Sequence, residues 1–112
     1  MTIFEKIAAR QIPAQIVHET EDFMAIRDVN PQAPVHILIV PKRVIPRLAE
    51  AVESDAQLLG EMLLASREIA QKLGVHESGY RIVINNGRDA GESVPHLHIH
   101  LLAGRPLQWP PG

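Results

Sequence analysis

Three histidines alternate with apolar residues near the end of the chain, in the run His96-Leu97-His98-Ile99-His100. Successive side chains of a β-strand point to opposite faces of the sheet. A strand over residues 96–102 therefore places the three imidazoles on one face and the apolar side chains on the other. The apolar set suits a face that packs against a helix, and the imidazole set suits a polar face near solvent or a ligand.

Two interpretations of this run involve no covalent chemistry. In the first, the histidines are ordinary polar residues on a solvated sheet face. In the second they hold a metal, because two histidines two positions apart on a strand can share a zinc ion. Three cannot easily do so, since the outer two begin about 13 Å apart at a rise of about 3.3 Å per residue. His36 is the candidate for a third ligand, because the chain has no cysteine.

The third interpretation is covalent catalysis at phosphorus. A neutral imidazole is a good nucleophile, and an unperturbed pKa of about 6.5 leaves histidine mostly neutral near neutral pH. For His98 to attack through one ring nitrogen, the other should donate a hydrogen bond that fixes the tautomer. His96 and His100 can then supply hydrogen bonds or positive charge to the phosphoryl oxygens. This interpretation explains the repetition of the histidines.

The loop over residues 85–93 leads straight into the histidines and favours the same chemistry. Gly87 and Gly91 allow the backbone to approach a ligand closely, and successive N–H groups in such a loop can bind an anion. Ser93 offers a hydroxyl that can reach an oxygen or a leaving group. Asn86-Gly87 is also an ordinary turn signal that needs no ligand. Beside three aligned histidines, we favour the phosphate-binding interpretation.

The elements that must position these residues indicate an α+β fold. A capping-box pattern at Thr2–Glu5 predicts a short helix over residues 3–9, ended by Pro13. A second pattern at Ser54–Gln57 predicts the opening of one long helix that ends before Gly74. Residues 46–51 suit a helical turn. Five strands, forming an antiparallel sheet, are predicted over residues 15–19, 22–27, 35–40, 80–85 and 96–102.

Length and composition exclude several classes of protein. The 112 residues suit one domain with a largely aliphatic core, and the three prolines in residues 104–112 predict an extended tail. A net charge of −2 with scattered lysines and arginines is not typical of a protein that coats nucleic acid. Disulfides and thiol chemistry are excluded. No apolar run approaches the roughly 20 residues of a membrane span, and no signal-peptide pattern opens the chain. We therefore expect a cytoplasmic protein.

The run over residues 96–102 matches the histidine-triad motif, in which three histidines alternate with apolar residues and two apolar residues follow. The flanking segments match as well: Thr2-Ile3-Phe4, residues 28–34, residues 35–42, Gly79-Tyr80-Arg81 and Trp109-Pro110-Pro111-Gly112. On these residues the chain resembles the histidine triad (HIT) family, and within it the nucleotide-binding branch. The likeness extends over almost the whole chain, so residues 1–112 are expected to form a single HIT domain.

The resemblance implies hydrolysis of purine nucleoside 5′-phosphoramidates, with AMP or GMP and an amine as products and without a cofactor or metal. His98 would attack the α-phosphorus to form a nucleotidyl-histidine, which water then releases. His96 would orient His98 through its backbone carbonyl. His100 and His36 would form the surroundings of the phosphate, and Ser93 would lie beside the leaving nitrogen.

The resemblance also implies a nucleoside site. Asp28 would accept the ribose hydroxyls, Asn85 would lie near the ribose and phosphate, and the backbone at Gly91 would approach the ligand. The apolar positions expected around the base are Ile3, Phe4, Ile7, Ile26, Val29 and Leu38, of which Ile7 and Leu38 also suit plain core packing. Three residues depart from the family pattern. Pro95 replaces a frequent aromatic immediately before the triad, a tolerable change at the start of a strand. Glu92 replaces a glutamine and would weaken binding or shift the pH optimum, and Arg27 adds a cation beside the ribose carboxylate.

Family members pair across their sheets and helices, and their C-terminal tails reach toward the partner's site. The resemblance thus implies a C2 homodimer in which Trp109 shapes the leaving-group side of the other subunit's pocket. Two other functions remain open. The protein could hydrolyse dinucleoside polyphosphates, or it could be a nucleotide-binding regulatory partner whose turnover is incidental.

Overall fold

A computed structural model describes residues 1–112 and contains one five-stranded antiparallel sheet with the strand order β1-β2-β3-β5-β4. The strands are β1 (Ile16–Glu19), β2 (Phe23–Arg27), β3 (Val35–Pro41), β4 (Tyr80–Val83) and β5 (Ile99–Ala103). The helices are α1 (Ile3–Ala8) and α2 (Ala56–Lys72), with short 3₁₀ turns η1 (Leu48–Glu50), η2 (Glu53–Asp55) and η3 (Arg88–Ala90). The predicted α+β class, with one short and one long helix, is confirmed.

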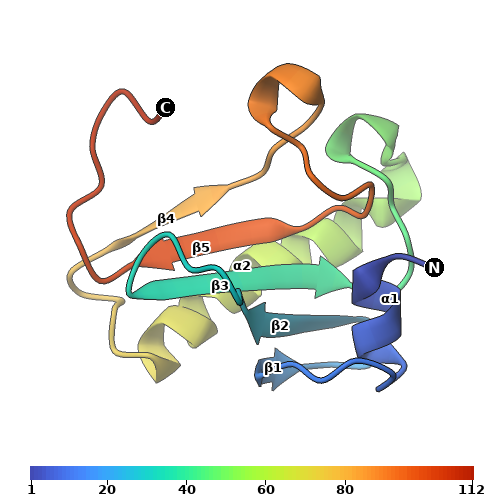
Figure 1. Cartoon of the computed structure of the whole chain (residues 1–112), viewed down its shortest axis with the longest axis horizontal. Helices are drawn as coiled ribbons and strands as arrows, with labels where there is room; N and C mark the ends of the chain where they lie inside the picture. The colour runs from blue at the N-terminus through green and yellow to red at the C-terminus, as the bar shows by residue number, and fades with distance from the viewer.

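The two helices cover opposite faces of the sheet (Figure 1). Ile37 and Ile39 of β3 point toward α2, where Met62 and Ile69 complete the larger hydrophobic cluster. Leu38, the residue between the two isoleucines, points the other way and packs in a smaller cluster with α1. Because side chains alternate along a strand, β3 has apolar residues on both faces and is almost entirely buried.

Local capping explains where α1 begins. The Thr2 hydroxyl accepts a hydrogen bond from the Glu5 N–H at 3.1 Å, and the Glu5 carboxylate accepts one from the Thr2 N–H at 2.9 Å. The reciprocal pair satisfies two N–H groups that a helix start would otherwise leave open. The predicted capping box is therefore confirmed.

The second predicted capping box, at Ser54, is wrong. The helix α2 has Asp55 at its N-cap without a side-chain cap, because the turn η2 precedes the helix and includes Ser54. The Asp55 carboxylate bonds back to the Val52 N–H at 2.9 Å and pairs with Arg43. Asp55 thus anchors the turn before the helix rather than the first turn of the helix.

The last strand begins at Ile99 rather than at His96 as predicted. The His96 N–H donates to the Val94 carbonyl at 2.8 Å, and the Leu97 N–H donates to the Ile45 carbonyl at 2.7 Å, so this stretch leaves the sheet ladder. The neighbouring strand β4 also ends early, at Val83, which pairs with His100. The alternation of faces nevertheless holds, and the apolar residues of the run lie in the larger cluster.

The far edge of the sheet and the C-terminal tail are open to solvent. Strand β4 pairs only with β5, so its other edge carries no partner strand. Residues 104–112 contain no helix or strand, and the tail runs past the end of the sheet (Figure 1). No helix of the fold is both long enough and apolar enough to cross a membrane.

Candidate active site

A cavity of about 260 Å³ opens on the α1 face of the sheet. Eleven of the residues predicted to form the site line it: Ile3, Phe4, Ile7, Ile26, Arg27, Asp28, Val29, Leu38, Ser93, His98 and His100. One end is apolar and the other presents histidine, serine and carboxylate groups. A largely apolar hollow with a few convergent polar groups is the usual form of a small-molecule site.

Five predicted site residues lie outside this lining. His36 and His96 are buried behind it, and each bonds to a group that contacts the cavity or helps to position it. Asn85, Gly91 and the 81% exposed Trp109 do not border the cavity, so their contact with a substrate stays a prediction. Within the lining, Arg27 lies at the exposed rim, because alternation along β2 directs its side chain away from the face of Ile26.

Sequence reasoning missed four residues of the lining, which are Ile12, Pro13, Ala14 and Val94. Three of them follow α1, where the chain must turn back to reach β1. The signal was available, because Pro13 shows that the helix must have ended before it, and the segment after the helix has to cross the same face. Val94 adjoins Ser93 and could have been included with it.

The nucleophile candidate has a defined tautomer. His98 Nδ1 lies 2.8 Å from the backbone carbonyl oxygen of His96. A carbonyl oxygen only accepts, so Nδ1 carries the hydrogen and Nε2 keeps its lone pair. The ring borders the cavity and lies against Phe4, with 5.2 Å between the ring centroids. The geometry therefore fixes a hydrogen on Nδ1 and leaves Nε2 without a hydrogen-bond partner in the protein.

His96 is completely buried, and its tautomer is fixed from both sides. Its Nε2–H donates to the Pro41 carbonyl at 2.7 Å, so Nδ1 accepts from the Thr2 hydroxyl at 2.7 Å. Burial lowers the pKa of His96, and so the ring stays neutral. Thr2 caps α1 as well, and thus links the helix that walls the cavity to the residue that orients His98. The sequence pointed only to the capping role of Thr2.

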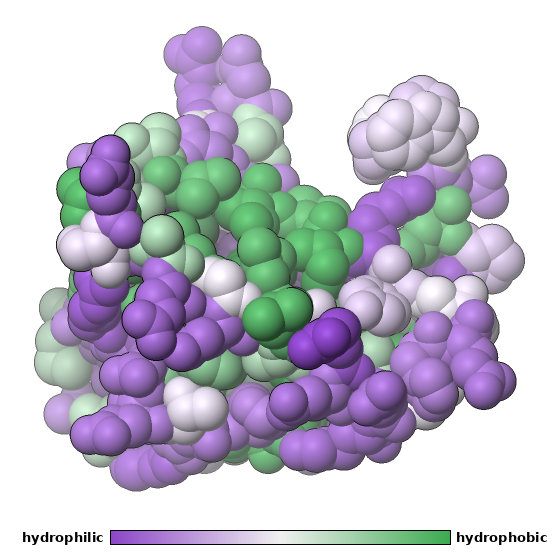
Figure 2. Space-filling view, turned by 180° about the vertical axis from the view of Figure 1, so that it is seen from behind, coloured by the Kyte–Doolittle hydropathy of each residue, from purple (hydrophilic) through white to green (hydrophobic).

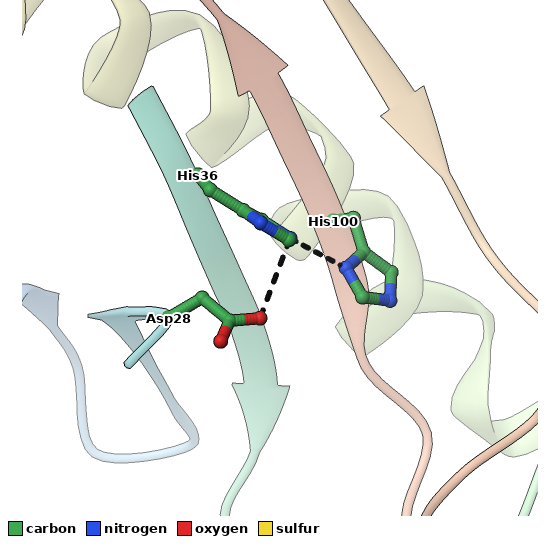
Figure 3. Close-up of side chains that lie close together, drawn as sticks. All are labelled: Asp28, His36 and His100. Carbon is green, nitrogen blue, oxygen red and sulfur yellow. Dashed lines mark hydrogen bonds and ion pairs between the residues drawn. The ribbon is translucent and has the colours of Figure 1, made fainter. Parts of the chain in front are cut away.

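A second histidine pair, His36 and His100, lies beside Asp28 (Figure 3), and the ring centroid of His100 is 5.0 Å from that of His98. The Gln32 N–H donates to His36 Nδ1 at 3.0 Å, so the hydrogen of His36 resides on Nε2. Nε2 donates to His100 Nδ1 at 2.9 Å and lies 3.4 Å from an Asp28 oxygen. His100 must then carry its own hydrogen on Nε2. The ring of His100 borders the cavity, so it provides a hydrogen-bond donor there.

Both rings of this pair are neutral near neutral pH. Burial, together with the nearby His98 and His36 rings, lowers the pKa of His100 to about 4. Burial also lowers the pKa of His36, although the Asp28 carboxylate works in the opposite direction. The pair is therefore a donor relay and not a fixed positive charge.

The same three residues are the only grouping that could hold a metal ion, since their ligand atoms lie within 4.8 Å of one another. The hydrogen-bond pattern does not fit a cation. The His36 nitrogen at the centre of the group carries a hydrogen, and it could bind a metal only if the bond from the Gln32 N–H were given up. Asp28 has one oxygen committed to the Asn30 N–H at 2.9 Å.

Three lowered histidine pKa values predict an acid-sensitive fold. The unfolded chain has histidine pKa values near 6.5, so between that pH and the lower folded values it binds more protons than the folded chain. Stability is therefore complete above about pH 6.5 and falls as the pH drops toward 4. His100 alone contributes on the order of 3 kcal/mol to this loss.

Urea unfolding at about pH 7.5 and about pH 4.5 measures this loss. Glu19, Asp55 and Glu92, whose pKa values are lowered by their partners, add to the loss only at the acidic end of this window, below about pH 5. A His100→Gln variant should show a smaller difference between the two pH values. Equal unfolding free energies for the parent at both pH values would contradict the prediction.

The loop before the histidines differs from the predicted anion-binding loop. Gly87 and Gly91 do adopt positive φ angles, of 89° and 80°. The N–H groups of Gly87, Gly91 and Glu92, however, all bond to acceptors within the loop. These three N–H groups are therefore not open to a phosphate. The exposed Ser93 is the residue of this loop that reaches the cavity.

Known proteins resemble this chain in both sequence and fold. The model of the HIT domain matches residues 9–107. A 14 kDa zinc-binding protein of Zea mays is 48% identical over 99% of this chain and 88% of its own length. A HIT family hydrolase from Legionella pneumophila has a TM-score of 0.97 at 43% identity, with all of both chains covered. The histidine triad nucleotide-binding protein of Candida albicans has a TM-score of 0.83 at 30% identity, covering 98% of this chain and 83% of its own.

The chain therefore belongs to the HIT domain family, as its histidine run indicated. Its α+β sheet is the HIT fold.

Proposed function

We propose that this protein hydrolyses purine nucleoside 5′-phosphoramidates through a covalent nucleotidyl-histidine. The observation that carries the proposal is the His98 ring, whose Nδ1–H is held by the His96 carbonyl while Nε2 remains open beside the cavity. The printed descriptions of similar proteins as a hydrolase and as a nucleotide-binding protein support the class of activity.

The cavity suggests how such a substrate binds. The purine would occupy the apolar end formed by Phe4, Ile7 and Leu38, and the ribose hydroxyls would face Asp28. The α-phosphate would then lie between His98, His100 and Ser93. In this pose the N–H of His100 donates to a phosphoryl oxygen, where negative charge develops during attack.

The chemistry divides into two displacements. In the first, the Nε2 lone pair of His98 forms a bond to the α-phosphorus while the phosphorus–nitrogen bond breaks. The amine leaves with its electron pair and takes up a proton from solvent, and the Ser93 hydroxyl would hydrogen-bond to the leaving nitrogen. The phosphorylated ring is cationic, and its Nδ1–H bond to the His96 carbonyl stabilises that charge. In the second, water attacks phosphorus, loses a proton and restores neutral His98.

Release of AMP from an AMP–amine phosphoramidate tests the proposal. Turnover of this substrate, and little turnover of a diadenosine polyphosphate, supports a phosphoramidase; the reverse preference supports a dinucleoside polyphosphate hydrolase. Nucleotide binding without turnover of either substrate supports a regulatory protein. Because the His36 tautomer does not fit a cation, turnover should survive treatment with a chelator. Activity that is lost on chelation and restored by zinc would overturn the metal-free mechanism.

We also propose that two chains form a C2 homodimer through α2 and the open edge of β4. Leu63 and Leu64 on α2 are 43% and 55% exposed, and Figure 2 shows the apolar surface on this side of the molecule. An open strand edge beside exposed leucines is a surface that a folded protein normally covers. Trp109 on the neighbouring tail would then lie against the partner.

A charged substitution in this surface should separate the chains. We expect the parent to have twice the 12.4 kDa mass of one chain in light scattering, and Leu64→Lys to shift the mass toward one chain. A Glu77→Lys variant, at a 93% exposed position outside this surface, is the matched control and should remain a dimer. A parent with the mass of a single chain would contradict the proposal.

A further inference from the structure

One ion pair ties the loop before the histidines to the segment after β3. Arg47 Nε donates to Glu92 Oε1 at 2.9 Å, and Arg47 Nη2 donates to Glu92 Oε2 at 3.0 Å. The Gly87 N–H donates to the same carboxylate at 3.0 Å. The two side chains are 32% and 15% exposed, so the pair is partly shielded from solvent. A bidentate arginine–carboxylate contact has a defined geometry and is stronger than a single bond.

The pair is the middle one of three contacts between these two segments. On one side, the Ala49 N–H donates to Asn86 Oδ1 at 2.8 Å, and on the other the Leu97 N–H donates to the Ile45 carbonyl at 2.7 Å. Arg47 and Glu92 therefore lie opposite each other in a fixed register. This register also places Ser93, the residue after Glu92, at the cavity.

The carboxylate would be unfavourable at this place without its partner. The Arg47 guanidinium, and next the Gly87 N–H, hold the pKa of Glu92 below its usual range, so the residue is charged at neutral pH. Glu92 directly precedes Ser93, which lines the cavity together with His98, so the chain brings this carboxylate to the edge of the candidate site. An uncompensated negative charge there would repel the phosphate of a nucleotide.

We propose that Arg47 is a positioning residue that neutralises Glu92 and so permits a carboxylate to stand beside the phosphate site. The proposal rests on the proposed function for the identity of the ligand. The resemblance to the family implied that Glu92, in place of a glutamine, would weaken nucleotide binding or shift the pH optimum. Arg47 also pairs with Glu50, but that carboxylate is 51% exposed, and it is Glu92 that raises the pKa of Arg47. The pairing with Glu92 therefore removes the penalty, and the negative charge becomes harmful only when Arg47 is lost.

The test compares AMP with adenosine, because only AMP carries the phosphate. Calorimetric titration of Arg47→Gln should show AMP affinity reduced about five- to tenfold, with adenosine affinity unchanged. The double variant Arg47→Gln with Glu92→Gln should recover AMP affinity to within about twofold of the parent. Arg88→Gln is the matched control, since Arg88 lies on the same loop but is 94% exposed and pairs only with Asp89.

A purely structural role gives a different pattern. If the double variant binds AMP as weakly as Arg47→Gln, or if adenosine affinity falls equally, the charge-neutralising role is overturned. A pH–rate profile gives an independent readout: Arg47→Gln should move the acidic limb to higher pH, and the double variant should move it back.

Failure of this proposal is separable from failure of the proposed function. If the parent turns over no phosphoramidate but the AMP and adenosine affinities follow the predicted pattern, the hydrolase function fails and the pairing stands. If the parent binds neither ligand, both fail.

Discussion

Replacing His98 with alanine should reduce phosphoramidate turnover by at least about 10⁴-fold, because it removes the nucleophile and with it the two-step route. Nucleotide binding should remain, since the apolar wall and Asp28 are left in place. Turnover is followed by AMP release, and binding by titration with AMP. His76→Ala is the control, because His76 is an exposed histidine outside the cavity and should leave turnover unchanged.

A rapid-quench experiment makes the same prediction more specific. If His98 attacks phosphorus, the parent mixed with substrate should briefly carry one nucleotidyl group per chain, detected as a mass increase of the intact protein. The alanine variant should show none. A His98→Ala protein that still accumulates the adduct would assign the nucleophile to another side chain, and one that keeps full turnover would exclude a covalent histidine altogether.

The elements of the fold were predictable because their signals are local. The alternation of Leu97, Ile99 and Leu101 with the histidines placed the apolar set on the α2 face, and the capping box fixed the start of α1. For the last strand, a distant contact decided the outcome. The last strand begins late because the Leu97 N–H finds the Ile45 carbonyl rather than a strand partner.

In the candidate site, too, local signals were predictable and most tertiary contacts were not. The spacing of the histidines indicated that His98 and His100 share a face at the cavity, but it did not show that His96 is buried behind them. The family likeness supplied the other site residues and their roles. The tautomers of His96 and His36 could not be predicted. That of His96 depends on Thr2 and Pro41, which the tertiary fold brings in, and that of His36 depends on the turn that aims the Gln32 N–H at its ring. These partners decide the chemistry, because a histidine with its hydrogen on the other nitrogen could not act as assigned. The neutralisation of the Glu92 charge could not be predicted either, since its partner Arg47 lies 45 positions away.

The donor role of His100 leads to the second large effect. His100→Leu removes the N–H that borders the cavity, and loss of one donor to a developing oxyanion typically reduces kcat by about 10²–10³-fold. It also leaves the His36 Nε2–H with only the Asp28 oxygen at 3.4 Å. The effect should fall on kcat more than on KM, because the donor matters most where charge develops in the transition state.

A His100→Gln variant distinguishes the loss of a hydrogen-bond donor from the loss of side-chain packing. Its amide oxygen can accept from the His36 Nε2–H, and its NH₂ group can donate into the cavity, so it reproduces both hydrogen bonds without a titratable ring. We therefore expect kcat in the order parent, then His100→Gln, then His100→Leu, measured at a pH where all three are folded. If glutamine and leucine reduce kcat equally, the donor relay from His36 through His100 is not what assists the reaction, and the pair serves only to pack the cavity wall.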